Sequence, residues 1–171
     1  MDINDAWKTT CRIVLGAEIG ELGEYENYLF KYLEPVLPKT SALSGRPVTI
    51  SRPVFCPKAK FISNDEMPQY DAKIRSLPLN INQIKDLDSL LSAIGPHFHY
   101  SGNQATGHSS DVIESDSVID SQVVYKSSEI WGGKFVAYSS MARLDECIFG
   151  VNWSGEAKYL ISCYQTFRQQ R

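Results

Sequence analysis

The stretch from Ser110 to Gly150 reads SDVIESDSVIDSQVVYKSSEIWGGKFVAYSSMARLDECIFG, with an aliphatic residue at every sixth position. The members of this aliphatic row are Val112, Val118, Val124, Ile130, Val136, Ala142 and Ile148. Three positions after each of the first six stands a small or turn-forming residue: Ser115, Ser121, Ser127, Gly133, Ser139 or Asp145. An α-helix would scatter such a row over several faces, whereas a short strand followed by a turn returns each member to the same side. The pattern therefore predicts a β-solenoid whose stacked units bury the row.

The rest of the chain has a different character, and it places the solenoid in an α+β protein. Residues 1–96 form a helical and extended region, and residues 97–171 form the solenoid-like region. We expect the helical N-terminal half to pack on or cap a C-terminal β-solenoid built on a six-residue repeat. A few ordinary antiparallel strands with regular spacing are the alternative.

Composition limits the classes of function. The chain has 171 residues, 43% of them hydrophobic, and a net charge of −3, which argues against a general nucleic-acid binder. It has no apolar run long enough to span a bilayer, and residues 1–5 lack the order of a secretory signal, so we expect a cytoplasmic protein with no membrane contact. The 4 cysteines lack metal-knuckle spacing and are interpreted as buried free thiols; no cofactor is expected.

Apolar periodicity predicts three helices before the solenoid, at about residues 5–17, 22–33 and 82–94. The first two are interpreted as a packing platform with a solvated acidic face. Residues 64–80 are expected to form a connecting loop. The third helix is amphipathic and stops at Gly95 and Pro96, so it is a candidate to cover the N-terminal end of the solenoid.

Prolines exclude helix between the second and third predicted helices, and this segment is basic. Between residues 39 and 60 it has no acidic residue, and its cations are Lys39, Arg46, Arg52, Lys58 and Lys60. One interpretation is a surface for an anionic ligand such as a phosphate group, RNA or an acidic protein segment. The other is that these cations pair with the acidic helices before them.

All three histidines stand close together, at His97, His99 and His108. On a strand, His97 and His99 would point to the same side, and a loop containing glycine could bring His108 back to share a metal ion with them. The alternative is one histidine hydrogen-bonded in a packed turn and the others exposed.

The units Ser117–Gln122, Val123–Ser128 and Phe135–Ser140 resemble hexapeptide-repeat left-handed β-helix proteins. Many members of that family are trimeric acyltransferases that use a histidine near a subunit boundary to activate the acceptor. The resemblance implies His108 as the catalytic general base. The family usually has a small residue after the aliphatic one, where this chain has Ile119, Tyr125 and Trp131, so a right-handed or flatter solenoid is equally admissible.

Bulky aromatic residues in and around the repeat suggest a binding surface. If Tyr125, Trp131, Tyr138, Phe149 and Trp153 stack outside the aliphatic row, they form a ladder that either binds a partner or packs against the N-terminal helices. We therefore expect a non-catalytic protein-interaction or assembly module that uses the repeat face or its open end. The transferase with His108 is the alternative.

The C-terminal residues 159–167 fit either further strands or a terminal helix. If strands continue, the last coil is open, which would mean that the chain is a fragment or that another molecule covers this end. We expect a homodimer formed through this end.

Overall fold

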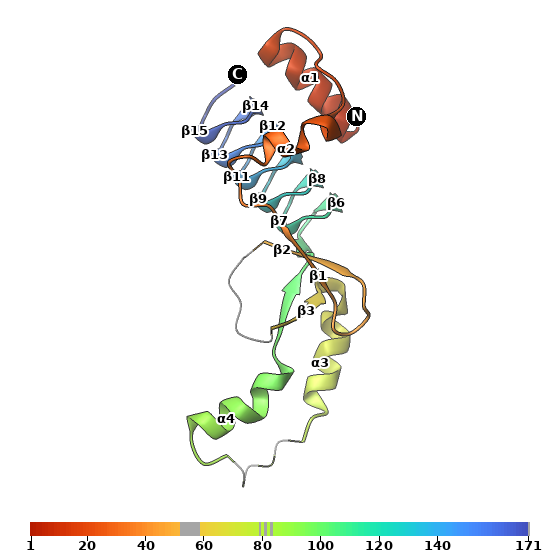
Figure 1. Ribbon diagram of the computed structural model, residues 1–171, viewed down its shortest axis with the longest axis vertical. Coiled ribbons are helices and arrows are strands. Elements are labelled where there is room, and N and C mark those ends of the chain that lie inside the picture. Colours follow the sequence, from red (N-terminus) through yellow and green to blue (C-terminus); the bar gives the residue numbers. More distant parts are fainter. Residues whose placement is uncertain (52–58, 79, 81, 83, 171) are drawn as a thin grey trace.

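The computed structural model describes residues 1–51, 59–78, 80, 82 and 84–170, and it is elongated (Figure 1). A stack of short strands forms one end of the molecule, with the N-terminal helices beside it. Two small sheets follow, and a pair of helices forms the opposite end. The predicted combination of N-terminal helices with a C-terminal β-solenoid is confirmed.

The N-terminal platform consists of α1 (Ile3–Leu15), the 3-10 helix η1 (Leu22–Tyr25) and the short α2 (Glu26–Leu29). The side chain of Asp2 caps α1 by accepting a hydrogen bond from the backbone N of Asp5 at 2.8 Å. Gly16 ends the helix with φ of 80°. The second helix, predicted at residues 22–33, is shorter than its apolar spacing suggested, because its first part is the 3-10 helix η1 and α2 ends at Leu29.

A β-hairpin and a parallel strand pair connect the platform to the solenoid. Strand β1 (Leu37–Thr40) pairs antiparallel with β2 (Pro47–Ile50), and β3 (Lys60–Ser63) pairs in parallel with β4 (His99–Gly102). The backbone N of Asn103 donates to the O of Thr49, and Asn103 Oδ1 accepts from the N of Thr49. The segment that enters the solenoid is thereby bound to β2.

The connection between β3 and β4 is helical. It contains η2 (Asn64–Glu66), α3 (Met67–Arg75), α4 (Leu87–Ile94) and η4 (Gly95–His97). The loop predicted at residues 64–80 is wrong, because α3 occupies most of it. Helix α4 starts later than expected, at the Asp86 cap, and it lies far from the solenoid strands rather than over their end (Figure 1).

The solenoid consists of short parallel strands that alternate between two sheets. One sheet has the order β14-β12-β10-β8-β6 and the other β15-β13-β11-β9-β7-β5. Their bounds are β5 (Ala105–Thr106), β6 (Ser110–Ile113), β7 (Asp116–Ile119), β8 (Gln122–Tyr125), β9 (Ser128–Trp131), β10 (Lys134–Ala137), β11 (Ser140–Arg143), β12 (Glu146–Phe149), β13 (Asn152–Gly155), β14 (Lys158–Ile161) and β15 (Tyr164–Phe167).

Paired residues in each sheet are separated by one turn of the solenoid. Val136 pairs with Val124 and with Ile148, while Ala142 pairs with Ile130 in the other sheet. A turn therefore contains twelve residues and passes through two sheets. The sequence allowed a flatter solenoid, and a turn that passes through two sheets has that flatter shape. At the C-terminal end, residues 159–167 continue as strands.

A regular backbone bend closes this short turn. Positive φ recurs at every third residue from Asp111 (53°) to Arg168 (54°), and in this series only positions 132 and 150 are glycine. Residues with a Cβ rarely adopt this region, because the Cβ approaches the backbone carbonyl. The stacked core and its hydrogen bonds must therefore offset the strain of each bend.

The aliphatic row forms the interior, as its spacing predicts. Val118, Val124, Ile130, Val136 and Ile148 are each 0% exposed. Serines fill the inner corners beside them: Ser127 Oγ donates to the O of Tyr125 at 2.8 Å and accepts from the N of Ser139 at 3.1 Å. The same bonds repeat at Ser115 and Ser139. These hydroxyls thus connect neighbouring turns inside the core.

Candidate functional site

The two outer faces of the solenoid have different surroundings. Strands β8, β10, β12 and β14 of the β6–β14 sheet are covered by α1, η1 and α2, and Trp7 is 1% exposed in this contact. Its ring contacts Phe149 edge-on, at 5.3 Å between centroids. Apolar residues of these strands, and Tyr138 directly after β10, pack against the helices: Val123, Tyr125, Phe135, Ala137, Tyr138, Cys147, Phe149, Tyr159 and Ile161. This face is therefore an internal interface.

A polar clamp secures α2 to the same face. Lys126 Nζ donates to both carboxylate oxygens of Glu26 at 2.8 Å, and the hydroxyl of Tyr138 donates to Glu26 Oε2 at 3.2 Å. Partial burial opposes the charge of Lys126, but the bond to Glu26 and nearby negative charge outweigh it, so its pKa is raised. Burial, with the neighbouring carboxylate of Glu26, also raises the pKa of Tyr138. Glu26 is therefore a docking residue rather than part of a solvated face.

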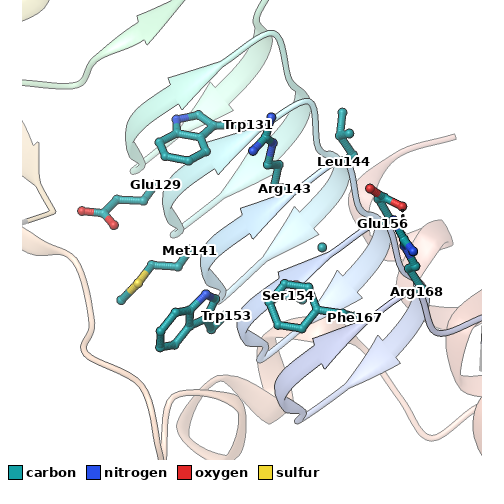
Figure 2. A pocket seen from close by; sticks show the side chains of 11 residues that line it. Glu129, Trp131, Met141, Arg143, Leu144, Trp153, Ser154, Glu156, Phe167 and Arg168 are labelled. Atoms are coloured by element: carbon teal, nitrogen blue, oxygen red, sulfur yellow. Dashed lines mark hydrogen bonds and ion pairs between the residues drawn. The ribbon is translucent and has the colours of Figure 1, made fainter.

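The β5–β15 sheet instead presents large apolar side chains to solvent. Trp131 is 48% exposed, Trp153 50% and Phe167 56%. Together with Met141 and Leu144 they line a groove of about 780 Å³. Figure 2 shows the side chains that line this groove, which come from strands β9, β11, β13 and β15 and from the turns after them. We call this surface the uncovered face. Its groove is lined by Glu129, Trp131, Met141, Arg143, Leu144, Trp153, Ser154, Gly155, Glu156, Phe167 and Arg168.

The solenoid register explains why these side chains gather. In each four-residue strand of this sheet, positions two and four point outward and position three points into the core. Residues twelve apart therefore form rows across the face. The rows are Glu129, Met141, Trp153 and Gln165 at position two, and Trp131, Arg143, Gly155 and Phe167 at position four. The groove lies where the glycine interrupts the second row.

Charged groups of both signs border the groove. Arg168 Nε donates to Glu156 Oε2 at 3.0 Å. The guanidinium of Arg143 forms no hydrogen bond or ion pair with any residue that the structure describes. An exposed cation beside apolar rings is suited to an acidic group on a binding partner.

The aromatic residues predicted as one ladder lie on different faces. Tyr125 and Tyr138 are beneath the helices, where their centroids are 5.6 Å apart, while Trp131 is on the uncovered face. Sequence reasoning missed Arg143, Gly155 and Phe167. Their spacing of twelve from Trp131 was the available signal, because residues one full turn apart share a face.

The three histidines have different surroundings. His97 ends η4, and its O lies 2.8 Å from His99 Nδ1 and accepts from the hydroxyl of Tyr70. His108 lies in the exposed turn between β5 and β6, where its N donates to Asp120 Oδ1. Within the described ranges, no group of three or more potential metal ligands is gathered. Metal binding by His97, His99 and His108 stays a prediction.

The basic segment is only partly described, since Arg52 and Lys58 lie outside the described residues. Arg46 Nη2 donates to Asp65 Oδ2 at 2.7 Å and lies 3.4 Å from Glu66 Oε1. Lys60 Nζ donates to the O of Pro96. The acidic partners of Arg46 follow it in the chain and do not come from the N-terminal helices.

Cysteine placement is consistent with packing. Cys11 and Cys147 are buried free thiols, and Cys163 is half-buried. Burial raises the pKa of Cys147 to about 11, so its nucleophilic thiolate is scarce at neutral pH. Cys56 lies outside the described residues.

Among the helices that the structure describes, none is long and apolar enough to cross a bilayer. Comparison with known proteins found no matching family model, no matching curated protein and no matching solved structure.

Proposed function

We propose that this chain is a non-catalytic protein-interaction module that binds another polypeptide through the uncovered face of its solenoid. The observation that supports this is the contrast between the two outer faces. One is covered by the chain's own helices, whereas the other carries half-exposed Trp131 and Trp153 beside an open groove. Contiguous exposed apolar surface with tryptophan, methionine and arginine is typical of protein-binding sites.

The composition of the groove favours a polypeptide over a substrate for chemistry. Its lining is mostly apolar, and it includes charged residues of both signs. The proposed general base of the alternative, His108, lies between β5 and β6, whereas the groove residues come from β9 to β15. A transferase would need a small-molecule site beside His108, separate from this groove.

Affinity capture with the immobilised chain tests the proposal. We compare the wild type with Trp131→Ser and Trp153→Ser, and use Tyr28→Ser as a matched control, because Tyr28 is 57% exposed on α2, away from the groove. Proteins that bind through the face are retained by the wild type and the control and lost from both tryptophan variants. Each protein found this way is then purified and titrated, and a negative heat-capacity change is expected from apolar burial.

Two outcomes would contradict the proposal. One is that both tryptophan variants retain every interaction of the wild type, including self-association. The other is that function in cells depends on His108, shown by its loss in His108→Ala while Trp131→Ser and Trp153→Ser behave as the wild type.

A further inference from the structure

One cation stands among the apolar side chains of the uncovered face. Arg143 is exposed at position four of β11, which lies between β9 and β13 in the sheet. It pairs with Trp131 on β9 and with Gly155 on β13. The guanidinium is therefore carried within the groove and not at either end of it.

Large apolar side chains lean over the glycines next to this arginine. A Cβ at Gly155 would lie 3.2 Å from Phe167 Cδ1, so the Phe167 ring covers that position. A Cβ at Gly132 would lie 2.7 Å from Leu144 Cδ2, so the Leu144 side chain covers that position in the same way. Figure 2 shows the arginine between Trp131 and Leu144. An apolar rim of Trp131, Leu144 and Phe167 thus borders the cation.

The other charged side chains of the groove are already engaged. Arg168 Nε donates to Glu156 Oε2 at 3.0 Å. Glu129 also has an interaction partner within the chain. Arg143, in contrast, forms no side-chain hydrogen bond or ion pair with the residues that the structure describes. The groove therefore holds one positive charge that no bonded neighbour neutralises.

A polypeptide that covers this face must take the guanidinium out of water. A charge that loses its water without gaining a counter-charge destabilises the complex. A carboxylate compensates for that loss, because it accepts two parallel hydrogen bonds from a guanidinium. A phosphate group carries close to two negative charges, whereas the groove offers one unpaired cation. A single carboxylate is therefore the matching group.

We infer, resting on the proposed function above, that the uncovered face binds an extended polypeptide segment in which one acidic side chain is flanked by large apolar ones, and that Arg143 binds the acidic side chain. The groove spans three strand spacings from β9 to β15, or about 14 Å. In an extended chain, side chains i, i+2 and i+4 point to the same side and also span about 14 Å. The segment therefore has the pattern apolar, any residue, acidic, any residue, apolar.

This pattern places each side chain of the segment against a matching group. The outer apolar side chains contact Trp131 at one end of the groove and Phe167 at the other, and Arg143 lies between these two rings in the row. A wholly apolar segment would leave the guanidinium unpaired, and a basic segment would repel it. The arginine thus sets the specificity, while the rings supply apolar burial.

Selection from a library of random short peptides, displayed through their C-termini, tests the inference with the purified chain as the bait. Display of this kind leaves no free terminal carboxylate, so a selected negative charge comes from a side chain. We expect the wild type to enrich the pattern above. Arg143→Glu should enrich a basic residue at the central position instead, because it reverses the charge inside an unchanged rim.

Arg75→Glu is the matched control for this charge reversal. Arg75 is exposed on α3, away from the solenoid, and its substitution changes the net charge by the same amount (Figure 1). The control should select the same pattern as the wild type. A pattern that changes as much with Arg75→Glu as with Arg143→Glu reflects net charge alone and counts against the inference.

A double-mutant cycle measures the contact directly. One selected peptide is synthesised with its acidic residue and with the corresponding amide, and each form is titrated against the wild type and Arg143→Gln by calorimetry. Either single change should weaken binding by about tenfold or more, and both together should weaken it little further. Circular dichroism and thermal melting verify that each variant is folded.

The outcomes separate this inference from the proposed function. Selected peptides that require Trp131 but carry no acidic residue, or that bind Arg143→Glu as well as the wild type, overturn the inference and leave the proposed function standing. Peptides that bind Trp131→Ser and Trp153→Ser as well as the wild type lie elsewhere on the chain and also overturn it. If the wild type enriches no pattern, the inference is wrong, and the capture experiment with the tryptophan variants then decides the proposed function.

Discussion

Asp116 Oδ2 accepts two hydrogen bonds from Ser51, one from its backbone N at 2.9 Å and one from its Oγ at 2.8 Å. The other oxygen, Oδ1, accepts from the N of Gln104 at 2.9 Å. Asp116 is only 2% exposed. A single buried carboxylate in the first complete turn thus joins the solenoid to the segment after β2 and to the loop after β4.

We therefore expect Asp116→Ala to destabilise the protein by about 3 kcal/mol, because it leaves several buried donors without an acceptor. Asp71→Ala is the control, since Asp71 is exposed on α3 and its side chain makes no hydrogen bond among the described residues. Urea unfolding of both variants measures the difference. Equal losses of stability would show that the carboxylate is not the link.

The serine hydroxyls that connect neighbouring turns inside the core give a second prediction. Ser127→Ala removes the acceptor of the Ser139 N–H inside the core, so we expect a loss of about 1–3 kcal/mol. Ser109→Ala is the comparison, because Ser109 accepts from the N of Ser121 in the same way but is only half-buried. Water can replace the Ser109 hydroxyl there, so Ser109→Ala should lose less unfolding free energy than Ser127→Ala. Denaturant titrations in which Ser109→Ala loses more stability than Ser127→Ala would contradict a stabilising role for the buried serine hydroxyls.

The solenoid was predictable because its core depends on local spacing. Val124 and Val136 are buried because of their position within the strand alone. The burial of Ser127 and Ser139 at the inner corners follows from the same spacing. The site was not predictable to the same degree. Whether Tyr125 or Trp131 is covered depends on which sheet the N-terminal helices contact, and that is a contact between segments far apart in the sequence.

The helical connection was also missed for a physical reason. Helix α3 has no buried residue, so its sequence carries little apolar periodicity, and it has no side-chain cap of its own because it continues from η2. Ser63 and Glu66 form a capping box just before it. That pattern is short and easily assigned to a loop.

Glu66 provides a prediction on pH. Hydrogen bonds, first from Ser41 Oγ at 2.6 Å and also from the N of Ser63, lower its pKa from 4.5 to about 2. Since the folded pKa is lower than the unfolded one, this group stabilises the fold above pH 4.5, and the contribution is lost as the pH falls towards 2. Glu66→Gln should flatten the decline of unfolding free energy in this range. An unchanged acid profile would show that other carboxylates determine it.

The last prediction concerns Gly150, where the solenoid approaches α2. Its φ is 68°, and a Cβ there would lie 2.7 Å from Leu29 Cδ2 and 3.2 Å from Leu29 Cα. Gly150→Ala must therefore displace the backbone of α2 as well as strain its own. Gly16→Ala is the matched control, because Gly16 has φ of 80° and a Cβ added to it would meet nothing within 4 Å. We expect the control to lose about 1 kcal/mol from backbone strain alone. Gly150→Ala should lose clearly more, and proteolysis near Leu29 should accelerate as α2 detaches. Equal losses in the two variants, with unchanged cleavage, would mean that α2 is not held against this turn.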